Sequence, residues 1–183
     1  MTDSQRTPPV VLGTVTLAKT RVFHVEGVSL RFANGVEVEY ERLRSDAGMA
    51  VMIVPMLDND TVLMIREYAA GVERYELALP KGRAEPGESV LEAANRELME
   101  EVGYGARLLE TLTSFTLAPS YLNHATQVVL ARDLYKQKLT GDEPEEIEVV
   151  PWRLSRLSEL LANPECTEAR SIAALFLVRE RLG

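Results

Sequence analysis

Three glutamates in the middle of the chain are the residues best suited to chemistry. Glu97, Glu100 and Glu101 are spaced by three and four residues, so a helix places them on neighbouring positions of one face. Like charges at this spacing destabilise a helix, and the helix dipole favours cations in its last turn. One interpretation is a solvated acidic helix face. The other is a site for hard divalent cations, which prefer carboxylate oxygens.

The residues around these glutamates favour the metal site. Gly82 is followed by five residues and Glu88, and then by seven residues and the run from Arg96 to Tyr104, Arg-Glu-Leu-Met-Glu-Glu-Val-Gly-Tyr. Seven positions of this pattern are identical to the signature of the Nudix hydrolases. At ~7% per residue, chance agreement is on the order of 10⁻⁸ per starting position. The chain therefore resembles that family, although Tyr104 stands where an aliphatic residue is commoner.

The resemblance implies the chemistry of the site. It implies Mg²⁺, with Mn²⁺ as a substitute, bound by Glu97, Glu101 and the main-chain carbonyl of Lys81. Glu100 is expected to be a further ligand or to lie beside the ligands. Arg96 can pair with nearby carboxylates, including Glu100 four residues later, and hold them in place. Such a metal neutralises a pyrophosphate and activates water. The reaction implied is hydrolysis of a nucleoside diphosphate linked to another group.

A second acidic segment completes the expected site. Five acidic residues lie within Asp142 to Glu148. In the ADP-ribose pyrophosphatases of the same family, a late loop supplies the general base and sometimes a metal ligand. By that resemblance Glu143 is the expected catalytic base and Glu145 a further metal ligand, because a carboxylate on a loop can approach the attacking water. The alternative interpretation is a solvated acidic turn.

Other segments indicate the substrate class. Arg66-Glu67-Tyr68 and Tyr75-Glu76-Leu77 resemble the stretch before the signature in ADP-ribose pyrophosphatases. Family members that hydrolyse ADP compounds are also similar at residues 66–71, 92–98, 117–121, 141–145 and 174–180. The resemblance implies hydrolysis of ADP-ribose, NADH and diadenosine polyphosphates, with AMP as a product. It also implies a homodimer in which N-terminal strands of one subunit reach the site of the other.

Four residues are the expected substrate contacts. Arg66 is predicted to bind phosphate or ribose, because a guanidinium group binds phosphate oxygens in pairs. Its alternative is an ion pair with Glu67 or Glu76 at a strand edge. Glu76 is itself a predicted substrate contact. Arg42 is expected to reach across a dimer, and Ser120 to line the site.

The elements that must position these residues indicate an α+β class, a mixed α/β fold with a mixed sheet between helices and an N-terminal antiparallel β-hairpin. Residues 1–12 are expected to be a loose arm. The hairpin spans Val28–Tyr40 and is predicted to close through a two-residue type I′ turn at Asn34-Gly35. Apolar patterning predicts the remaining strands at 49–57, 61–68, 74–79, 107–115, 126–132 and 147–153 and the helices at 88–102, 157–161 and 168–182.

The expected domain organisation follows from these elements. Residues 1–45 form an arm and hairpin suited to dimerisation, and residues 46–183 form a Nudix hydrolase domain with its signature at 82–104.

Composition excludes several classes of protein. With 46% hydrophobic residues the chain of 183 residues is too apolar to be disordered, and its single cysteine, Cys166, allows no intrachain disulfide. No apolar run approaches the length of a membrane span. The net charge is −8, and no cluster of basic residues indicates a nucleic-acid partner. We expect a soluble cytoplasmic protein with neither nucleic-acid nor membrane partners.

The acidity is concentrated where the site is predicted. Residues 83–101 carry six acidic and two basic side chains, and residues 142–148 carry five acidic side chains and none that is basic. Two alternative functions stay open. One is a Nudix pyrophosphatase for other nucleoside diphosphate derivatives, such as sugar nucleotides. The other is a non-catalytic module that senses ADP-ribose, which the complete set of signature glutamates disfavours.

Overall fold

The computed structural model describes residues 6–45 and 48–183. The chain divides into two units, the first formed by Met1–Ala47 with Thr116–His124 and the second by Gly48–Phe115 with Ala125–Gly183. Within the described residues, no helix combines the length and the apolar character needed to cross a membrane.

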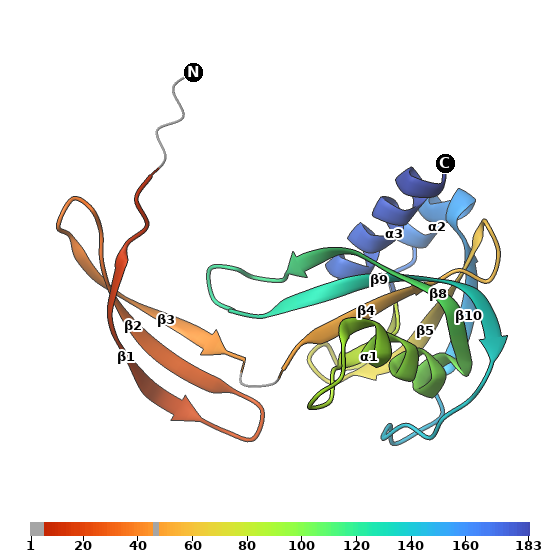
Figure 1. The fold of residues 1–183 in the computed structure, drawn as a ribbon, viewed down its shortest axis with the longest axis horizontal. Helices are drawn as coiled ribbons and strands as arrows, with labels where there is room; N and C mark the ends of the chain where they lie inside the picture. The colour runs from red at the N-terminus through yellow and green to blue at the C-terminus, as the bar shows by residue number, and fades with distance from the viewer. Residues whose placement is uncertain (1–5, 46–47) are drawn as a thin grey trace. The chain divides into compact units, whose positions relative to one another are not determined.

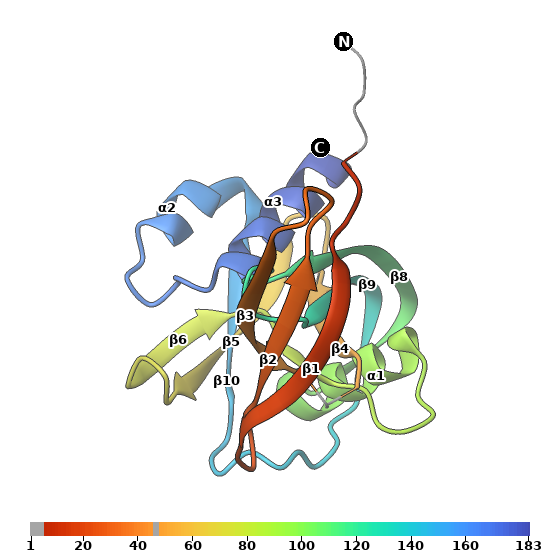
Figure 2. The same cartoon turned by 90° about the vertical axis from the view of Figure 1, so that its left-hand side faces the viewer.

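The first unit is built on an antiparallel sheet with the order β1-β2-β3, formed by β1 (Val10–Lys19), β2 (His24–Arg31) and β3 (Glu37–Arg44) (Figure 2). The predicted N-terminal hairpin is confirmed as β2 and β3. The loose arm predicted at 1–12 is wrong from Val10 onward, because Val10 pairs with Arg31 at the free edge of β2. Residues 1–5 lie outside the described residues. Only tertiary structure supplies the strand edge that β1 needs.

The hairpin closes differently from the prediction. Phe32 accepts a hydrogen bond from the Gly35 amide and donates one to the Val36 carbonyl, so the loop has three residues rather than two. A type I′ turn needs positive φ at both central residues, and only Gly35 has it, at 84°. The Asn34 side chain instead accepts a hydrogen bond from the Val36 amide. The predicted two-residue turn is therefore wrong, although its glycine is essential.

The second unit contains two sheets. One is antiparallel, with the order β10-β5-β6, and the other has the order β7-β4-β9-β8 and is mixed, because β4 and β9 run parallel. Their strands are β4 (Ala50–Pro55), β5 (Thr61–Ala69), β6 (Arg74–Ala78), β7 (Lys81–Arg83), β8 (Tyr104–Thr116), β9 (Ala125–Lys136) and β10 (Glu148–Arg153). The helices are α1 (Val90–Glu97), the π-helical turn η1 (Leu98–Val102), the short 3-10 turn η2 (Leu154–Arg156), α2 (Leu157–Leu161) and α3 (Ala169–Leu182).

The central strands β4, β5 and β9 contain runs of residues buried on both faces, and alternate residues of these runs belong to different cores. Met52 and Val54 of β4 join the core cluster that contains α3, whereas Val51 and Ile53 join the cluster that contains α1. Strands β5 and β9 divide in the same way, and Figure 1 shows α1 and α3 on opposite sides of β4. The predicted fold class, with sheet sandwiched between helices, is confirmed.

Candidate active site

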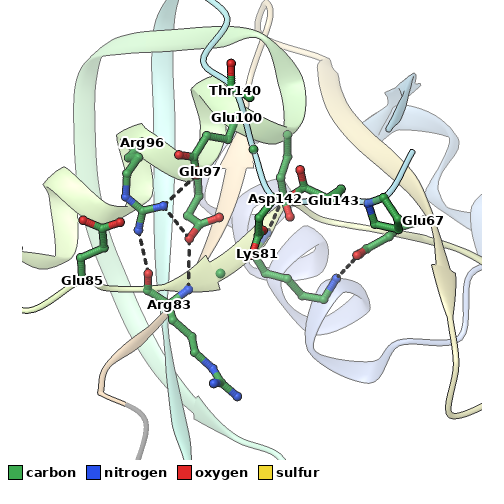
Figure 3. A pocket seen from close by; sticks show the side chains of 14 residues that line it. Glu67, Lys81, Arg83, Glu85, Arg96, Glu97, Glu100, Thr140, Asp142 and Glu143 are labelled. Carbon is green, nitrogen blue, oxygen red and sulfur yellow. Dashed lines mark hydrogen bonds and ion pairs between the residues drawn. The ribbon is translucent and has the colours of Figure 1, made fainter. Parts of the chain in front are cut away.

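A cavity of about 660 Å³ in the second unit brings the two acidic segments together. Its walls come from β5, β7, α1 with η1, and the loop that precedes β10 (Figure 3). Glu97, Glu100 and Glu101 line one side and Glu143 lines the loop side, so carboxylates more than 40 positions apart in the sequence face one space. Arg96 and Lys81 are the predicted site residues that complete its lining.

The helix that carries the three glutamates begins and ends as its sequence indicates. Ser89 caps the first turn in a reciprocal capping box with Glu92, and Gly103 ends the helical segment with a left-handed φ of 79°. From Leu98 onward the turn widens to π-helical geometry, a feature that frequently marks functional sites. Glu97 therefore closes the α-helix, whereas Glu101 lies within the π turn.

Glu97 and Glu101 are buried. Only 8% of Glu97 and 4% of Glu101 is exposed, so the interpretation as a solvated acidic face is wrong for this pair. Glu101 accepts a hydrogen bond of 2.8 Å from the Lys81 amide, and Glu97 accepts one of 3.1 Å from the Arg83 amide. Burial nevertheless raises the pKa of Glu101 to about 8 and raises the pKa of Glu97 above its ordinary value. Both carboxylates would gain from a cation beside them.

Arg96 forms hydrogen bonds with several carboxylates at the edge of the cavity. Its guanidinium donates to Glu97 at 3.0 Å, to Glu100 at 2.7 Å and to the carbonyl of Arg83 at 2.7 Å (Figure 3). It also donates to Glu88 at 2.8 Å. The predicted pair with Glu100 is confirmed. The hydrogen bond from Arg96 lowers the pKa of Glu88, and the carboxylates raise the pKa of Arg96 itself. Since its donors are occupied, Arg96 orients carboxylates rather than reacting.

A glycine is required at position 82 because the main chain there lies very close to the side chain of Glu97. A β-carbon at this position would overlap the carboxylate of Glu97. Gly82 lies in β7, which pairs with β4 opposite Val51. The absence of a side chain therefore lets the edge of the sheet meet the helix that carries the glutamates.

The donor set fits a hard divalent cation. The cavity is lined by carboxylate oxygens and main-chain groups and by neither histidine nor cysteine. Mg²⁺ and Mn²⁺ prefer such oxygen ligands, whereas a structural zinc ion prefers histidine and cysteine. Among the described residues, no three His, Cys, Asp or Glu side chains are grouped closely enough to hold an ion by themselves. Mg²⁺ commonly keeps waters and substrate oxygens beside one or two carboxylates, so the arrangement suits it.

The late loop supplies one predicted residue to the cavity and directs the other elsewhere. Glu143 lines the cavity with its neighbours Thr140 and Asp142. Glu145, a predicted metal ligand, is not part of that lining and accepts a hydrogen bond of 2.7 Å from the Tyr75 hydroxyl.

Arg66 lies outside this cavity. It donates to Glu148 at 2.6 Å and to Glu165 at 3.1 Å, so the partners proposed for an ion pair, Glu67 and Glu76, are wrong. Alternation along β5 explains its position. Arg66 shares a face with Val62 and Met64, which pack in the α3 cluster.

The sequence reasoning missed Glu67. Glu67 has the parity of Leu63 and Ile65, which pack in the cluster of α1, and it lines the cavity with its carboxylate 3.5 Å from the Lys81 ammonium. The alternation along β5 can be read from the sequence and separates Glu67 from Arg66, but only the structure shows which of the two faces borders the cavity. Arg83 and Thr140 also line the cavity without having been predicted. Asp142, another of the five acidic residues within 142–148 from which the base was expected, lines it as well.

Glu76 lines a second pocket of about 280 Å³, which shares Glu67 and Lys81 with the first cavity. Glu76 is buried and accepts hydrogen bonds from Arg74 and Thr167. Burial by itself would raise the pKa of Glu76, but these hydrogen bonds outweigh it and hold the pKa below its ordinary value.

Arg42 and Ser120 belong to the first unit. Arg42 and Arg44 both bind Glu26, a carboxylate only 3% exposed, at 3.0 and 2.9 Å. Ser120 lines a pocket of about 340 Å³ together with Tyr40.

Comparison with known proteins identifies the family. Residues 46–176 match the NUDIX domain, and residues 9–42 match the NudE-type Nudix hydrolase N-terminal domain. The chain is 52% identical to the ADP compounds hydrolase NudE of Escherichia coli (strain K12), over 95% of this chain and 93% of that protein. It is 30% identical to an ADP-ribose pyrophosphatase of Bacillus subtilis (strain 168), over 87% of this chain and 89% of that one.

A solved structure agrees with these relatives. A crystal structure of an ADP compounds hydrolase is 51% identical in sequence and superposes with a TM-score of 0.90, covering 97% of this chain and 95% of the other. The chain therefore belongs to the Nudix family and is a Nudix hydrolase.

Proposed function

We propose that this enzyme hydrolyses the pyrophosphate bond of ADP-linked compounds, with ADP-ribose, NADH and diadenosine polyphosphates as substrates and AMP as a product. The observation that carries the proposal is the meeting of buried Glu97 and Glu101 with Glu143 across one cavity. The names of the two curated relatives, an ADP compounds hydrolase and an ADP-ribose pyrophosphatase, support the substrate class.

Mg²⁺, replaceable by Mn²⁺, is the proposed cofactor. Glu97, Glu101 and the carbonyl of Lys81 would hold it, with Glu100 beside them. When bound, the cation supplies charge neutralisation of the pyrophosphate and acidification of a water. The protein contributes fixed geometry, because Arg96 and the amides that bind Glu97 and Glu101 keep the carboxylates in place.

Glu143 is the proposed general base. Its carboxylate takes a proton from a water, the water oxygen bonds to phosphorus, and the bond to the bridging oxygen of the pyrophosphate breaks. Glu143 is half-buried, and its segment has no helix or strand geometry between residues 137 and 147. A carboxylate on such a loop can adjust to the attacking water after substrate binds.

The adjoining pocket suits the uncharged end of the substrate. Ala69, Val72 and Ala78 line it, and Glu67 and Lys81 line both this pocket and the main cavity. Pockets that bind nucleosides combine apolar walls with a few polar groups, and Glu76 supplies a carboxylate here. In this arrangement the pyrophosphate lies in the main cavity and a base or ribose in the smaller one.

One assay tests the substrate class. The protein is incubated with Mg²⁺ and ADP-ribose, NADH, diadenosine triphosphate or ADP-glucose in parallel, and AMP is measured. We expect AMP from the first three, and its loss when the metal is removed with a chelator. AMP from ADP-glucose alone would indicate a sugar-nucleotide pyrophosphatase, and binding of ADP-ribose without turnover would indicate a sensor.

We also propose that the first unit mediates a homodimer and that Arg42 and Ser120 serve the substrate within it. Strand β1 is exposed along its length, and Val10, Val11, Val15 and Leu17 are each more than half exposed. Exposed apolar surface of this extent is typical of interaction sites. Sedimentation should show a dimer, and Val15→Glu should shift it toward monomer.

A further inference from the structure

Side chains of β5 and β6 bind two residues of the acidic segment 142–148, one in the late loop and one at the start of β10. The hydroxyl of Tyr75 in β6 donates to Glu145 at 2.7 Å, and Arg66 in β5 donates to Glu148 at 2.6 Å. Strands β5 and β6 pair side by side, with Tyr68 opposite Tyr75. The two attachments therefore come from one rigid surface, and they bind residues that do not line the cavity.

Glu143 belongs to the part of the loop that lines the cavity, and the attached residues Glu145 and Glu148 follow it in the chain. Residues 140–144 line the cavity, and Ile147 is buried in the core beside α1. Ile147 fixes the far end of the segment. The contact between Tyr75 and Glu145 is two residues from Glu143, closer in sequence than the contact at Glu148.

Charge repulsion between the loop and the cavity's carboxylates opposes the position of the loop beside the cavity. The segment 142–148 carries five acidic residues and borders a cavity lined by Glu67, Glu97, Glu100 and Glu101. Repulsion between like charges favours a loop that lies away from the cavity. A hydrogen bond to a carboxylate is stronger than one between neutral groups and directs the acceptor, so it can oppose that tendency. The bond to Glu145 raises the pKa of Tyr75, which keeps the phenol protonated as a donor.

The position of Glu143 also depends on Gly141. A β-carbon at Gly141 would overlap the carboxylate of Glu143, so this side chain folds back over the glycine. A small shift of the loop would therefore change where the carboxylate lies. The hydrogen bond from Tyr75 to Glu145, two residues away, therefore bears on where the Glu143 carboxylate lies.

We propose that Tyr75, with Glu145 as its acceptor, is a positioning residue that holds the loop so that Glu143 faces the cavity. The inference rests on the proposed function, because it takes Glu143 as the base. It gives Glu145 the task of anchoring the loop rather than that of binding metal. Tyr75 touches neither metal nor substrate in this role.

Tyr75→Phe removes only the hydroxyl. We expect kcat to fall about 10-fold, because the variant loses one charge-assisted hydrogen bond and the base shifts from its position. The KM and the Mg²⁺ concentration for half-maximal activity should stay unchanged. Tyr68→Phe is the matched control, because Tyr68 is similarly exposed, stacks edge-on with Tyr75 at 5.6 Å and makes no hydrogen bond through its hydroxyl within the described residues. Equal activity of both variants and the unaltered protein would overturn the proposal.

Two substitutions at Glu145 separate anchoring from metal binding. Glu145→Gln keeps an acceptor for the Tyr75 hydroxyl and should retain most activity, whereas Glu145→Ala should match Tyr75→Phe. The double variant Tyr75→Phe/Glu145→Ala should be no slower than either single variant. A large loss in Glu145→Gln that extra Mg²⁺ restores would instead identify Glu145 as a ligand and overturn the proposal.

The Glu143→Gln background distinguishes positioning from a general structural effect. If Tyr75 acts through Glu143, Tyr75→Phe should cause no further loss of kcat in that background. A further 10-fold loss would overturn the proposal while leaving the base assignment intact. An active enzyme whose kcat is unaffected by Glu143→Gln would refute the base and the positioning role together. Thermal unfolding of each variant verifies that the fold is retained.

Discussion

The two acidic segments of the cavity use the same side chain in opposite ways. Glu97 and Glu101 on α1 and η1 are almost fully buried, and each accepts a main-chain hydrogen bond. Asp142 and Glu145 on the late loop are exposed, and Glu143 is half-buried. One segment is held in a single geometry before any ligand arrives. The other is held by a few side-chain contacts and can adjust, which suits binding in the first case and proton transfer in the second.

Removal of a buried carboxylate charge should have the largest effect. Glu101→Gln keeps the size of the side chain but weakens a metal ligand, so we expect activity to fall about 10³-fold. The fold should be retained, because the amide oxygen can still accept from the Lys81 amide. Steady-state kinetics and circular dichroism measure both. Retained activity would show that Glu101 binds no metal.

The matching change on the loop should be smaller and different in kind. Glu143→Gln should lower kcat about 10²-fold, the usual contribution of a general base, with little change in substrate affinity. Pre-steady-state turnover and substrate titration separate the two quantities. Were affinity for Mg²⁺ to fall instead, Glu143 would belong with the metal ligands of α1.

Two glycines provide a direct comparison of rigidity. Alanine at Gly82 or Gly141 places a methyl group on a glutamate carboxylate, that of Glu97 or Glu143. Glu97 is held by Arg96 and an amide and cannot yield easily, so Gly82→Ala should cost about 1–3 kcal/mol of stability.

Gly141→Ala should leave stability unchanged, because the half-buried Glu143 can move aside. The displaced base should nevertheless lower kcat about 10-fold. Urea unfolding and turnover are measured for both variants. Equal losses of stability would show that the loop is as rigid as the helix.

The smallest effect is a pH dependence of the metal-free protein. Glu101 has an ordinary pKa of 4.5 and a pKa of about 8 when folded, chiefly because of burial, with Glu97 and Glu67 adding to the rise and Lys81 opposing it. Between these values the folded chain keeps a proton that the unfolded chain loses. Rising pH therefore favours unfolding over this range.

Relative to Glu101→Gln, the unaltered protein should lose about 5 °C of Tm between pH 5 and pH 8.5. Mg²⁺ should restore the difference at pH 8.5 and have little effect at pH 5, where protons compete for the site. Calorimetry in chelator and in Mg²⁺ tests this. A flat difference would show that Glu101 is ionised without metal.

Some features of the site follow from local spacing alone. The helix beginning at Ser89, its end at Gly103 and the approach of Arg96 to Glu100 depend on residues within a few turns of one another, and the structure confirms them. Apolar patterning likewise predicted most strands. The late loop was predicted to carry Glu143 from a resemblance, and its place in the cavity agrees.

Other features required contacts between distant segments. Sequence did not reveal that Glu145 would bind Tyr75, that Arg66 would bind Glu148 and Glu165, or that β1 would pair with β2. Each of these depends on which strands become neighbours. The alternation of side chains along β5 can be read from the sequence. Which face Arg66 and Glu67 each share with a helix follows only once the packing of the helices is known.

The sequence by itself determined the spacing of the signature glutamates, because a helix repeats every few residues and the signature lies within one local segment. Tertiary structure decided which carboxylates are buried and which are exposed. Desolvation and the partners of a carboxylate come from elements far away in the chain, and these decide whether a glutamate is suited to bind a cation or to move a proton.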